Sequence, residues 1–372
     1  MTAYRRLTTA STTVVTYGAG LGRCHDAKEE CMSGNAVYCP SNTAVLTVCA
    51  IDAPVVVTSD QLDERLADTY RRVGLRPGIL QLLAGIHERR WWSEGMTFAD
   101  GAAMAGAKAL ADAGVDPSRV GLMVNTSVSR AHLEPSTAVG VHHAIGLPSS
   151  CQNFDVTNAC LGFVNGMQLA SAMIDTGQID YALIVNGEDA RTIHELTIER
   201  LNQPGSTARE VMSQFASLTL GSGAAAMVLG RADAHPEGHR IVGGVSRAAT
   251  QHHGLCVGDV DEMHTDAKGL MDAGLDLTEA MWAQASTQFD WDRGMDCYVI
   301  HQVSQVHTSA LCERLGIDIT RVPRTFPLRG NIGPASVPTT LAAQAELLEA
   351  GQRVLLMGIG SGLNASCLEL CW

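Results

Sequence analysis

The sequence has 372 residues and a net charge of −13, and charged residues make up only 17% of it. A chain of this length can bury a sizeable core in one large or two smaller packing units. Its acidic balance argues against nucleic-acid binding and against a basic membrane patch. No apolar run approaches the ~18 residues of a membrane span, so we expect no span and a cytoplasmic location. The eleven cysteines include no C-x-x-C pair, which predicts reduced thiols and no bound metal.

The first predicted elements follow an atypical N-terminal segment. Residues 1–41 lack helix or strand periodicity, and we expect them to form a poorly ordered extension. After it, the pattern predicts a helix over residues 59–74 with Ser59 as N-cap, a helix over 98–114 and a buried strand over 120–126.

The next stretch contains one unusually apolar helix. A short helix over residues 140–145 and a strand over 153–156 lead into a helix over 160–176, and a strand over 181–185 follows. Because residues 160–176 are apolar almost all round, this helix should be buried on every side.

The second half of the chain repeats this order. Equivalent positions lie about 175 residues apart, as in a duplicated unit. We therefore predict two α/β halves, residues 42–230 and 231–372, whose two sheets enclose two helices in a layered αβαβα fold. The elements expected in the second half are a strand over 297–300, a helix over 306–315, an extended segment over 324–328, a helix over 337–350 and a strand over 354–358.

Cys160 is the candidate nucleophile. It lies where a predicted strand meets the apolar helix, and unpaired backbone N–H groups and the helix dipole favour a thiolate at such a position. An arbitrary free cysteine is more often a small buried apolar residue, but the junction in a duplicated α/β chain favours the catalytic interpretation.

His301 and Asn331 complete a possible set for acyl transfer. His301 follows the strand over 297–300, and the duplication places it at the same sheet end as Cys160. Asn331 lies in a glycine-rich turn before a helix. A satisfied structural histidine and ordinary turn chemistry are the simpler alternatives. Together, however, the three residues match what nucleophilic acyl transfer and an oxyanion site require.

Glu134 is the candidate base. A carbon–carbon bond needs a carbanion, made either by loss of CO₂ or by removal of an α-proton. Glu134 lies on the loop after the strand over 120–126, with Pro135 preventing helix continuation. A solvent-exposed loop carboxylate is the alternative.

Several motifs around these positions resemble the thiolase superfamily, near ketoacyl-ACP synthase III. The resemblance spans roughly residues 44–372, and its closer match is the OleA-type branch, which joins two fatty acyl-CoAs head to head in olefin and β-lactone biosynthesis. The superfamily motifs are DVTNACLGF (155–163), HQVS (301–304) and GNIGPASVP (330–338), and those of the branch are NTSVSR (125–130), LEPST (133–137) and GIGSGLN (358–364).

The resemblance implies a duplicated five-layered thiolase fold and a role for each candidate. Cys160 would be the acylated nucleophile, His301 and Asn331 the oxyanion site, and Glu134 the base for the second acyl chain. In this branch the glutamate reaches the neighbouring subunit's site, which implies a homodimer or a heterodimer with a paralogous subunit. Fatty acyl-CoA is then substrate, and no resident cofactor is expected.

The resemblance also suggests coenzyme A contacts near Arg89, Arg90 and Trp91. Arginine can bind phosphate and tryptophan can stack on adenine, although an interface or surface motif is an equal alternative. The glycines of residues 358–362 should give an acyl chain room near Cys160.

The predicted reaction is a non-decarboxylative Claisen condensation of two long-chain acyl-CoAs to a 2-alkyl-3-ketoacid. Ketoacyl-ACP synthase III enzymes typically have His-Gln-Ala-Asn where this chain has HQVS. They use a malonyl extender and lack the glutamate. Two alternatives remain open: a decarboxylating enzyme of that kind, and a non-catalytic partner subunit in a heterodimer.

Overall fold

The computed structural model describes residues 37–285 and 288–372. The expected N-terminal extension, residues 1–41, therefore lies mostly outside the described residues. Its last part departs from the expectation, because β1 (Val37–Tyr38) pairs antiparallel with β9 (His239–Ala248) in the main sheet.

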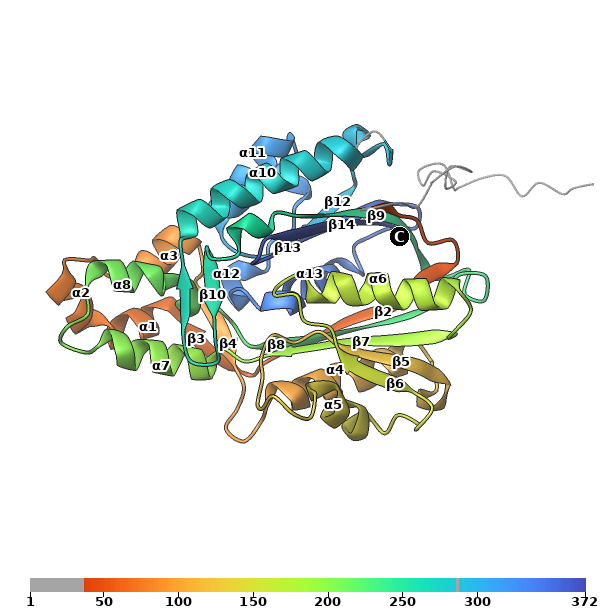
Figure 1. The fold of residues 1–372 in the computed structure, drawn as a ribbon, viewed down its shortest axis with the longest axis horizontal. Coiled ribbons are helices and arrows are strands. Elements are labelled where there is room, and N and C mark those ends of the chain that lie inside the picture. Colours follow the sequence, from red (N-terminus) through yellow and green to blue (C-terminus); the bar gives the residue numbers. More distant parts are fainter. Residues whose placement is uncertain (1–36, 286–287) are drawn as a thin grey trace, which may run out of the picture.

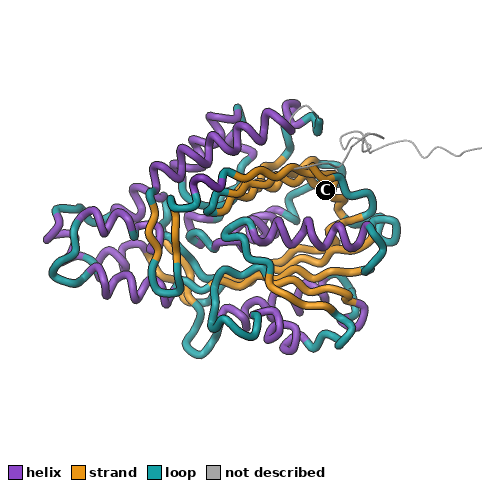
Figure 2. The backbone as a smooth tube through the Cα atoms, viewed as in Figure 1, coloured by secondary structure: helices purple, strands orange, loops and turns teal. Residues whose placement is uncertain are grey.

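The main sheet is folded into two tiers (Figures 1 and 2). Its order is β12-β13-β14-β9-β2-β8-β7-β5-β6, with β1 beside β9. We predicted two separate sheets, but the tiers are joined where Ala44 and Val45 pair with Arg240 and His239. The bounds are β2 (Thr43–Asp52), β5 (Val120–Asn125), β6 (Gln152–Asp155), β7 (Tyr181–Glu188), β8 (Gly223–Arg231), β12 (Cys297–Ile300), β13 (Arg353–Gly360) and β14 (Asn364–Cys371).

Helices form three layers around the two tiers (Figure 1). Two lie between the tiers, α6 (Gly162–Asp175) and α13 (Ser336–Gln344). The outer faces carry α10 (Ala267–Ala285) and α11 (Gln305–Leu315) on one side and α4 (Phe98–Asp112) and α5 (Thr137–Ile145) on the other. The predicted αβαβα layering is confirmed.

The duplication is visible in the strand pairing. In the first half β5 is parallel to β7, and the antiparallel strands β8 and β2 follow. In the second half β12 is parallel to β13, and the antiparallel strands β14 and β9 follow. Strand β7 of the first half therefore corresponds to β13 of the second half, and the two strands lie on either side of the central helices (Figure 1).

Helix α6 is the centre of the core, but it is not buried on every side as predicted, because Leu169 is 37% exposed and Ala172 is also exposed. Phe163, Val164 and Met167 are at most 1% exposed, and they pack with residues of both tiers such as Ile184 and Leu356. At about 25 cal/mol per Å² of apolar surface removed from water, each of these side chains contributes on the order of 2 kcal/mol to stability.

The remaining elements form a helical lobe and short connections. The lobe lies at the left in Figure 1 and has its own apolar core around Leu62, Leu66 and Tyr70. Its elements are α1 (Ser59–Arg65), α2 (Ala67–Val73), α3 (Ile79–Ala84), α7 (Arg191–Leu201), α8 (Ala208–Ser213), α9 (Phe215–Leu218) and the hairpin β3 (Val55–Thr58) with β4 (Glu88–Trp91). Nearby are β10 (Cys256–Gly258), β11 (Met263–Thr265) and α12 (Phe326–Arg329), and the 3₁₀ turns are η1 (Pro117–Arg119), η2 (Thr250–His252), η3 (Trp291–Arg293), η4 (Ile319–Arg321) and η5 (Gly333–Ala335).

Several predicted boundaries are wrong. The helix predicted over 59–74 is broken at Leu66 into α1 and α2, and the helix predicted over 160–176 begins at Gly162. Thr58, not Ser59, caps α1, because its side chain accepts from Gln61 N while the Gln61 side chain accepts from Thr58 N. The segment over 324–328, expected to be extended, ends in the short helix α12, and the helix over 337–350 ends at Gln344.

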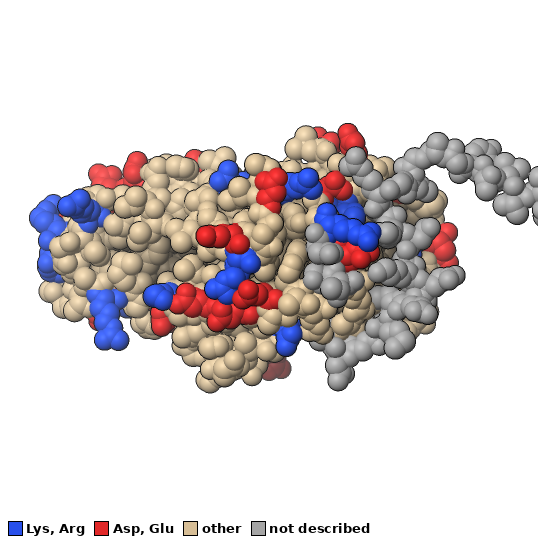
Figure 3. All heavy atoms as spheres, turned by 90° about the horizontal axis from the view of Figure 1, so that it is seen from above, with Lys and Arg blue, Asp and Glu red and all other residues tan. Residues whose placement is uncertain are grey.

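Three composition-based expectations, on basic patches, membrane spans and thiols, have different outcomes. The face in Figure 3 carries basic side chains interspersed with acidic ones rather than a continuous basic stripe. Among the described residues, no helix is long and apolar enough to cross a bilayer. Cys39 and Cys371 are disulfide-bonded, which contradicts the expectation that all thiols are reduced, whereas Cys160 is free.

Candidate active site

Cys160 lies in a tight turn between β6 and α6. The preceding residue, Ala159, has a left-handed φ of 45°, which is uncommon for a residue with a Cβ. Helix α6 begins at Gly162 with Leu161 as its N-cap, so Cys160 precedes the helix rather than opening it. The turn is held by Asn158, which donates to Asn165 Oδ1 (2.8 Å) and accepts from Asn364 Nδ2 (3.2 Å).

The surroundings of Cys160 favour the neutral thiol. Burial, with the negative field of Glu188 in second place, raises its pKa to about 12. This contradicts the expectation of a thiolate, because loss of solvation outweighs the short-range helix dipole. Attack on a thioester must therefore be accompanied by loss of the thiol proton.

His301 follows β12 and lies against the end of β13. Its backbone N donates to Met357 O at 2.8 Å, and its side chain is 3% exposed. Burial, followed by the neighbouring His307, lowers the pKa of His301 to about 3. The imidazole is therefore neutral, and its Nδ1 has no partner among the described residues.

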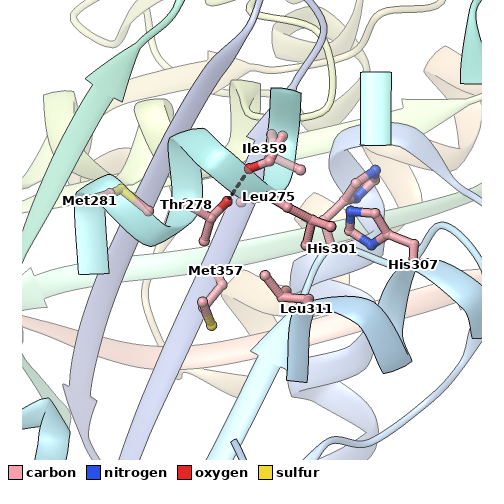
Figure 4. Close-up of a pocket in the computed structure, with 10 residues that line it drawn as sticks. Leu275, Thr278, Met281, His301, His307, Leu311, Met357 and Ile359 are labelled. Atoms are coloured by element: carbon pink, nitrogen blue, oxygen red, sulfur yellow. Dashed lines mark hydrogen bonds between the residues drawn. The ribbon is translucent and has the colours of Figure 1, made fainter. Parts of the chain in front are cut away.

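His301 lines a small pocket of about 20 Å³ between α10, α11 and β13. His307, on the first turn of α11, also faces this pocket (Figure 4). The rest of the lining is mostly apolar and includes Leu275, Met281, Leu311, Met357 and Ile359. The pocket thus combines two buried imidazoles with a surface suited to a hydrocarbon chain.

Asn331 lies in a rigid turn before η5. Its backbone N donates to Thr219 O and its carbonyl accepts from Gly221 N, both at 2.9 Å. Its side-chain Oδ1 accepts from Gly333 N (2.9 Å). Because Oδ1 is engaged within the turn, the amide orientation is fixed, and Nδ2 donates to none of the described residues.

The end of β13 joins the nucleophile to the histidine. A Cβ at Gly360 would lie 2.8 Å from Asn158 O and 3.3 Å from Leu161 N, so the backbone of the Cys160 turn packs directly on this strand end. Met357, three residues earlier, holds His301. The glycines of residues 358–362 therefore make room first for the nucleophile turn, and Gly358 also lines the pocket.

The end of β7 joins the nucleophile to the asparagine turn. A Cβ at Gly333 would lie 3.6 Å from the carboxyl carbon of Glu188, the last residue of β7, and the field of Glu188 acts on Cys160. The turn of Cys160 and His301 therefore lie at the end of β13, and the turn of Asn331 lies at the end of β7.

Glu134 lies apart from this pocket. Residues 131–135 are all exposed, and Leu133, its neighbour, is 97% exposed. The carboxylate is not among the pocket-lining residues. Within one chain, the structure therefore places Glu134 on the surface.

Arg89 does not fit the predicted coenzyme A contact. Its side chain is fully buried and donates to Ser59 Oγ (3.0 Å) and Leu218 O (3.1 Å), so it joins β4 to α1 and α9 within the lobe. Arg90 and Trp91 are half-buried. Arg90 pairs with Glu88 at 3.0 Å, and Trp91 Nε1 donates to His194 Nδ1 at 3.0 Å.

Two residues of the site were missed by the sequence analysis. Glu188 is a carboxylate at the end of the buried strand predicted over 181–185, a sheet-end position that could have identified it. His307 lies six residues after His301 on the following helix. No feature of the sequence around it indicated that it would lie beside His301.

Comparison with known proteins identifies the family. Models of 3-oxoacyl-[acyl-carrier-protein (ACP)] synthase III match residues 154–248, and those of its C-terminal part match residues 292–372. The acyl-CoA:acyl-CoA alkyltransferase of Xanthomonas campestris is 45% identical over 334 residues, which cover 89% of this chain and 99% of that protein. The Shewanella oneidensis protein of the same name is 35% identical over 335 residues, covering 86% and 96%.

Solved structures agree with the sequence relatives. A cysteine-to-serine variant of Xanthomonas campestris OleA, with bound lauric acid and lauroyl-CoA, superposes with a TM-score of 0.87 at 44% identity and covers 89% of this chain and 99% of that one. A beta-ketoacyl-[acyl-carrier-protein] synthase III from Rhodospirillum rubrum is more distant, at 28% identity over 83% of this chain and 92% of that protein. The chain belongs to the acyl-CoA:acyl-CoA alkyltransferase (OleA) family of the thiolase superfamily.

Proposed function

We propose that the protein joins two long-chain fatty acyl-CoAs by a non-decarboxylative Claisen condensation through an acyl-Cys160 intermediate. The observation that carries this proposal is the 45% identity of the chain to a named acyl-CoA:acyl-CoA alkyltransferase. The position of the Cys160 turn at the end of β13, where His301 lines an apolar pocket, supports it.

The first half-reaction is acyl transfer to sulfur. Cys160 Sγ attacks the carbonyl carbon of one acyl-CoA, the bond to the CoA sulfur breaks, and the thiol proton leaves with free CoA. The neutral His301 imidazole and Asn331 Nδ2 can each donate to the carbonyl oxygen as it gains negative charge. The apolar lining of the pocket beside His301 suits contact with the acyl chain.

The second half-reaction forms the carbon–carbon bond. Glu134 removes an α-proton from a second acyl-CoA, and the resulting carbanion attacks the acyl-Cys160 carbonyl. The Cys160 sulfur leaves and regains a proton, which gives a 2-alkyl-3-ketoacyl-CoA. Hydrolysis of this thioester by water yields the 2-alkyl-3-ketoacid and CoA, with no resident cofactor required.

Glu134 would act in the site of a partner subunit. Its exposure within one chain supports this proposal, because a second copy or a paralogous subunit can bring it to the condensing site. Mixing Cys160→Ala and Glu134→Ala proteins tests it: random dimers of two inactive variants should recover about one quarter of the wild-type activity. No recovery after exchange of subunits would contradict a base supplied by the partner.

Coenzyme A contacts are proposed for Arg90 and Trp91 only. Both side chains are half-buried. They face opposite sides of β4, so each would contact the coenzyme separately, Arg90 at a phosphate and Trp91 at the adenine ring. Because acyl-CoA thioesters are cytoplasmic metabolites, we propose the cytoplasm as the location, which fractionation of cells would test.

Purified protein offered myristoyl-CoA without any malonyl donor tests the proposed reaction. We expect a thioester adduct on Cys160 by intact mass, followed by a ketoacid or its ketone. An adduct without condensation would favour the decarboxylating alternative, to which the distant synthase III relative corresponds. Full activity of a Cys160→Ala protein in an assembled complex would favour the non-catalytic partner.

A further inference from the structure

Glu188 is a buried carboxylate whose role the proposed reaction does not explain. It is 7% exposed at the end of β7. Its Oε1 accepts from Val128 N (2.8 Å) and Asn186 Nδ2 (3.2 Å), and its Oε2 accepts from Ser129 N (3.0 Å) and Ser129 Oγ (2.7 Å). Every one of these partners is a donor.

This arrangement requires an ionised carboxylate. Ser129 Oγ already accepts from Asp189 N at 3.0 Å, so its own hydrogen is directed to Glu188. Burial raises the pKa of Glu188, and the hydrogen bonds from Ser129 and Val128 oppose that rise. An amide in the same place would direct an N–H₂ group at backbone N–H donors, which leaves buried donors unpaired.

The residues that Glu188 holds are the start of the loop that carries Glu134. The same short segment is bound from its other side by Arg130, whose Nη1 donates to the carbonyls of Ser127 (2.6 Å) and Ser129 (3.0 Å). Glu188 thus binds backbone N–H groups of this segment, and Arg130 binds its carbonyl groups. Because the segment is held in this way, the position at which the exposed part of the loop begins is fixed.

Glu188 also lies against the turn that carries Asn331. Gly333, in the turn after Asn331, packs against its carboxyl group, and Trp92 Nε1 donates to its backbone carbonyl at 2.9 Å. One buried carboxylate therefore lies between the loop of the base and the turn of the oxyanion site.

We propose that Glu188 is a positioning residue for the condensing step: it anchors residues 128–129 and thereby sets the path of the loop that presents Glu134. The proposal rests on the proposed function, in which Glu134 is the base. It predicts that loss of Glu188 separates the two half-reactions, since Cys160 acylation does not use the loop and condensation does.

The test compares Glu188→Gln with Glu195→Gln, an isosteric control at an exposed carboxylate on α7. For Glu188→Gln we expect Cys160 acylation by myristoyl-CoA to be kept or to rise, and condensation to fall by at least about tenfold. In the Glu134→Gln background the second substitution should add no further loss of condensation. Hydrogen exchange at residues 128–129 should become faster, and the control should match wild type in all three measurements.

Three results would overturn the proposal: condensation equal to that of the control, equal losses in both half-reactions, or unchanged hydrogen exchange at 128–129. If Glu188→Gln does not fold, Ser129→Ala removes one of the four hydrogen bonds and should show the same separation to a smaller degree. Absence of any Cys160 thioester in the wild-type protein would instead overturn the proposed function.

Discussion

Gly360 is the position where one added methyl group tests the geometry of the nucleophile turn most directly. In Gly360→Ala the new Cβ would lie 2.8 Å from Asn158 O and 3.3 Å from Leu161 N. Both neighbours are backbone atoms of the turn that holds Cys160, so the turn must shift. Overpacking of this kind costs roughly 1–3 kcal/mol, and misplacement of a reacting group by about an ångström lowers rates roughly 10²-fold.

We therefore expect Gly360→Ala to slow Cys160 acylation by about 10- to 100-fold and to lower the free energy of unfolding by about 1–3 kcal/mol. The assays are the time course of the acyl adduct by intact mass and urea denaturation. Gly205→Ala is the matched control, because its Cβ meets no atom within 4 Å. Wild-type acylation by Gly360→Ala would refute the packing of this turn on β13.

Three further predictions concern acid stability, the arginine pair and the pocket. Burial lowers the pKa values of His301 and His307 to about 3 and about 4. Below about pH 6.5 these histidines bind protons in the unfolded chain but not in the folded protein. The free energy of unfolding should therefore fall, by up to roughly 1.4 kcal/mol per pH unit for each histidine, as the pH drops from about 6.5 toward 4. His307→Gln should reduce that slope in urea titrations, and an unchanged slope would contradict the assignment. Arg89→Met should lower the unfolding free energy by about 1–3 kcal/mol without raising the KM for acyl-CoA, whereas Arg90→Met should raise the KM with little effect on stability; the opposite pattern would restore Arg89 as a coenzyme A contact. Gly274→Leu should narrow the pocket and raise the KM for long-chain acyl-CoAs at least about fivefold, with little change in the KM for short-chain acyl-CoAs. An equal rise in KM for both chain lengths would place the acyl chain outside this pocket.

Much of the fold could be predicted because its signals are local or periodic. The all-round apolar pattern of residues 160–176 predicted a buried helix, and the constant offset between the halves predicted equivalent strand ends. Even the wrong cap of α1 had a local signal, since Thr58 with Gln61 three residues later is a capping box. Whether the hydroxyl of Thr58 or that of Ser59 caps the helix depends on the backbone geometry at the helix start, which the sequence alone does not determine.

The errors at the site have a different origin, because they depend on contacts between distant segments. Arg89 and Arg90 are adjacent in sequence, but successive residues of β4 face opposite sides, so one is buried against the lobe and the other is not. Glu188 receives its hydrogen bonds from Val128 and Ser129, about 60 residues earlier. No pattern within a single element reveals that such a carboxylate is satisfied.

The state of Cys160 shows how magnitudes decide between opposing effects at one position. A helix N-terminus stabilises a nearby negative charge by about 0.3–1 kcal/mol at an exposed site. The rise in the Cys160 pKa from about 9 to about 12 corresponds to roughly 4 kcal/mol against the thiolate, so burial and Glu188 together outweigh the helix. An ionised Glu188 accepts from its four donors, and the same charge adds to the effect of burial, which is the larger cause of the raised Cys160 pKa. Anchoring of the base and suppression of the free thiolate are therefore two consequences of the same buried charge.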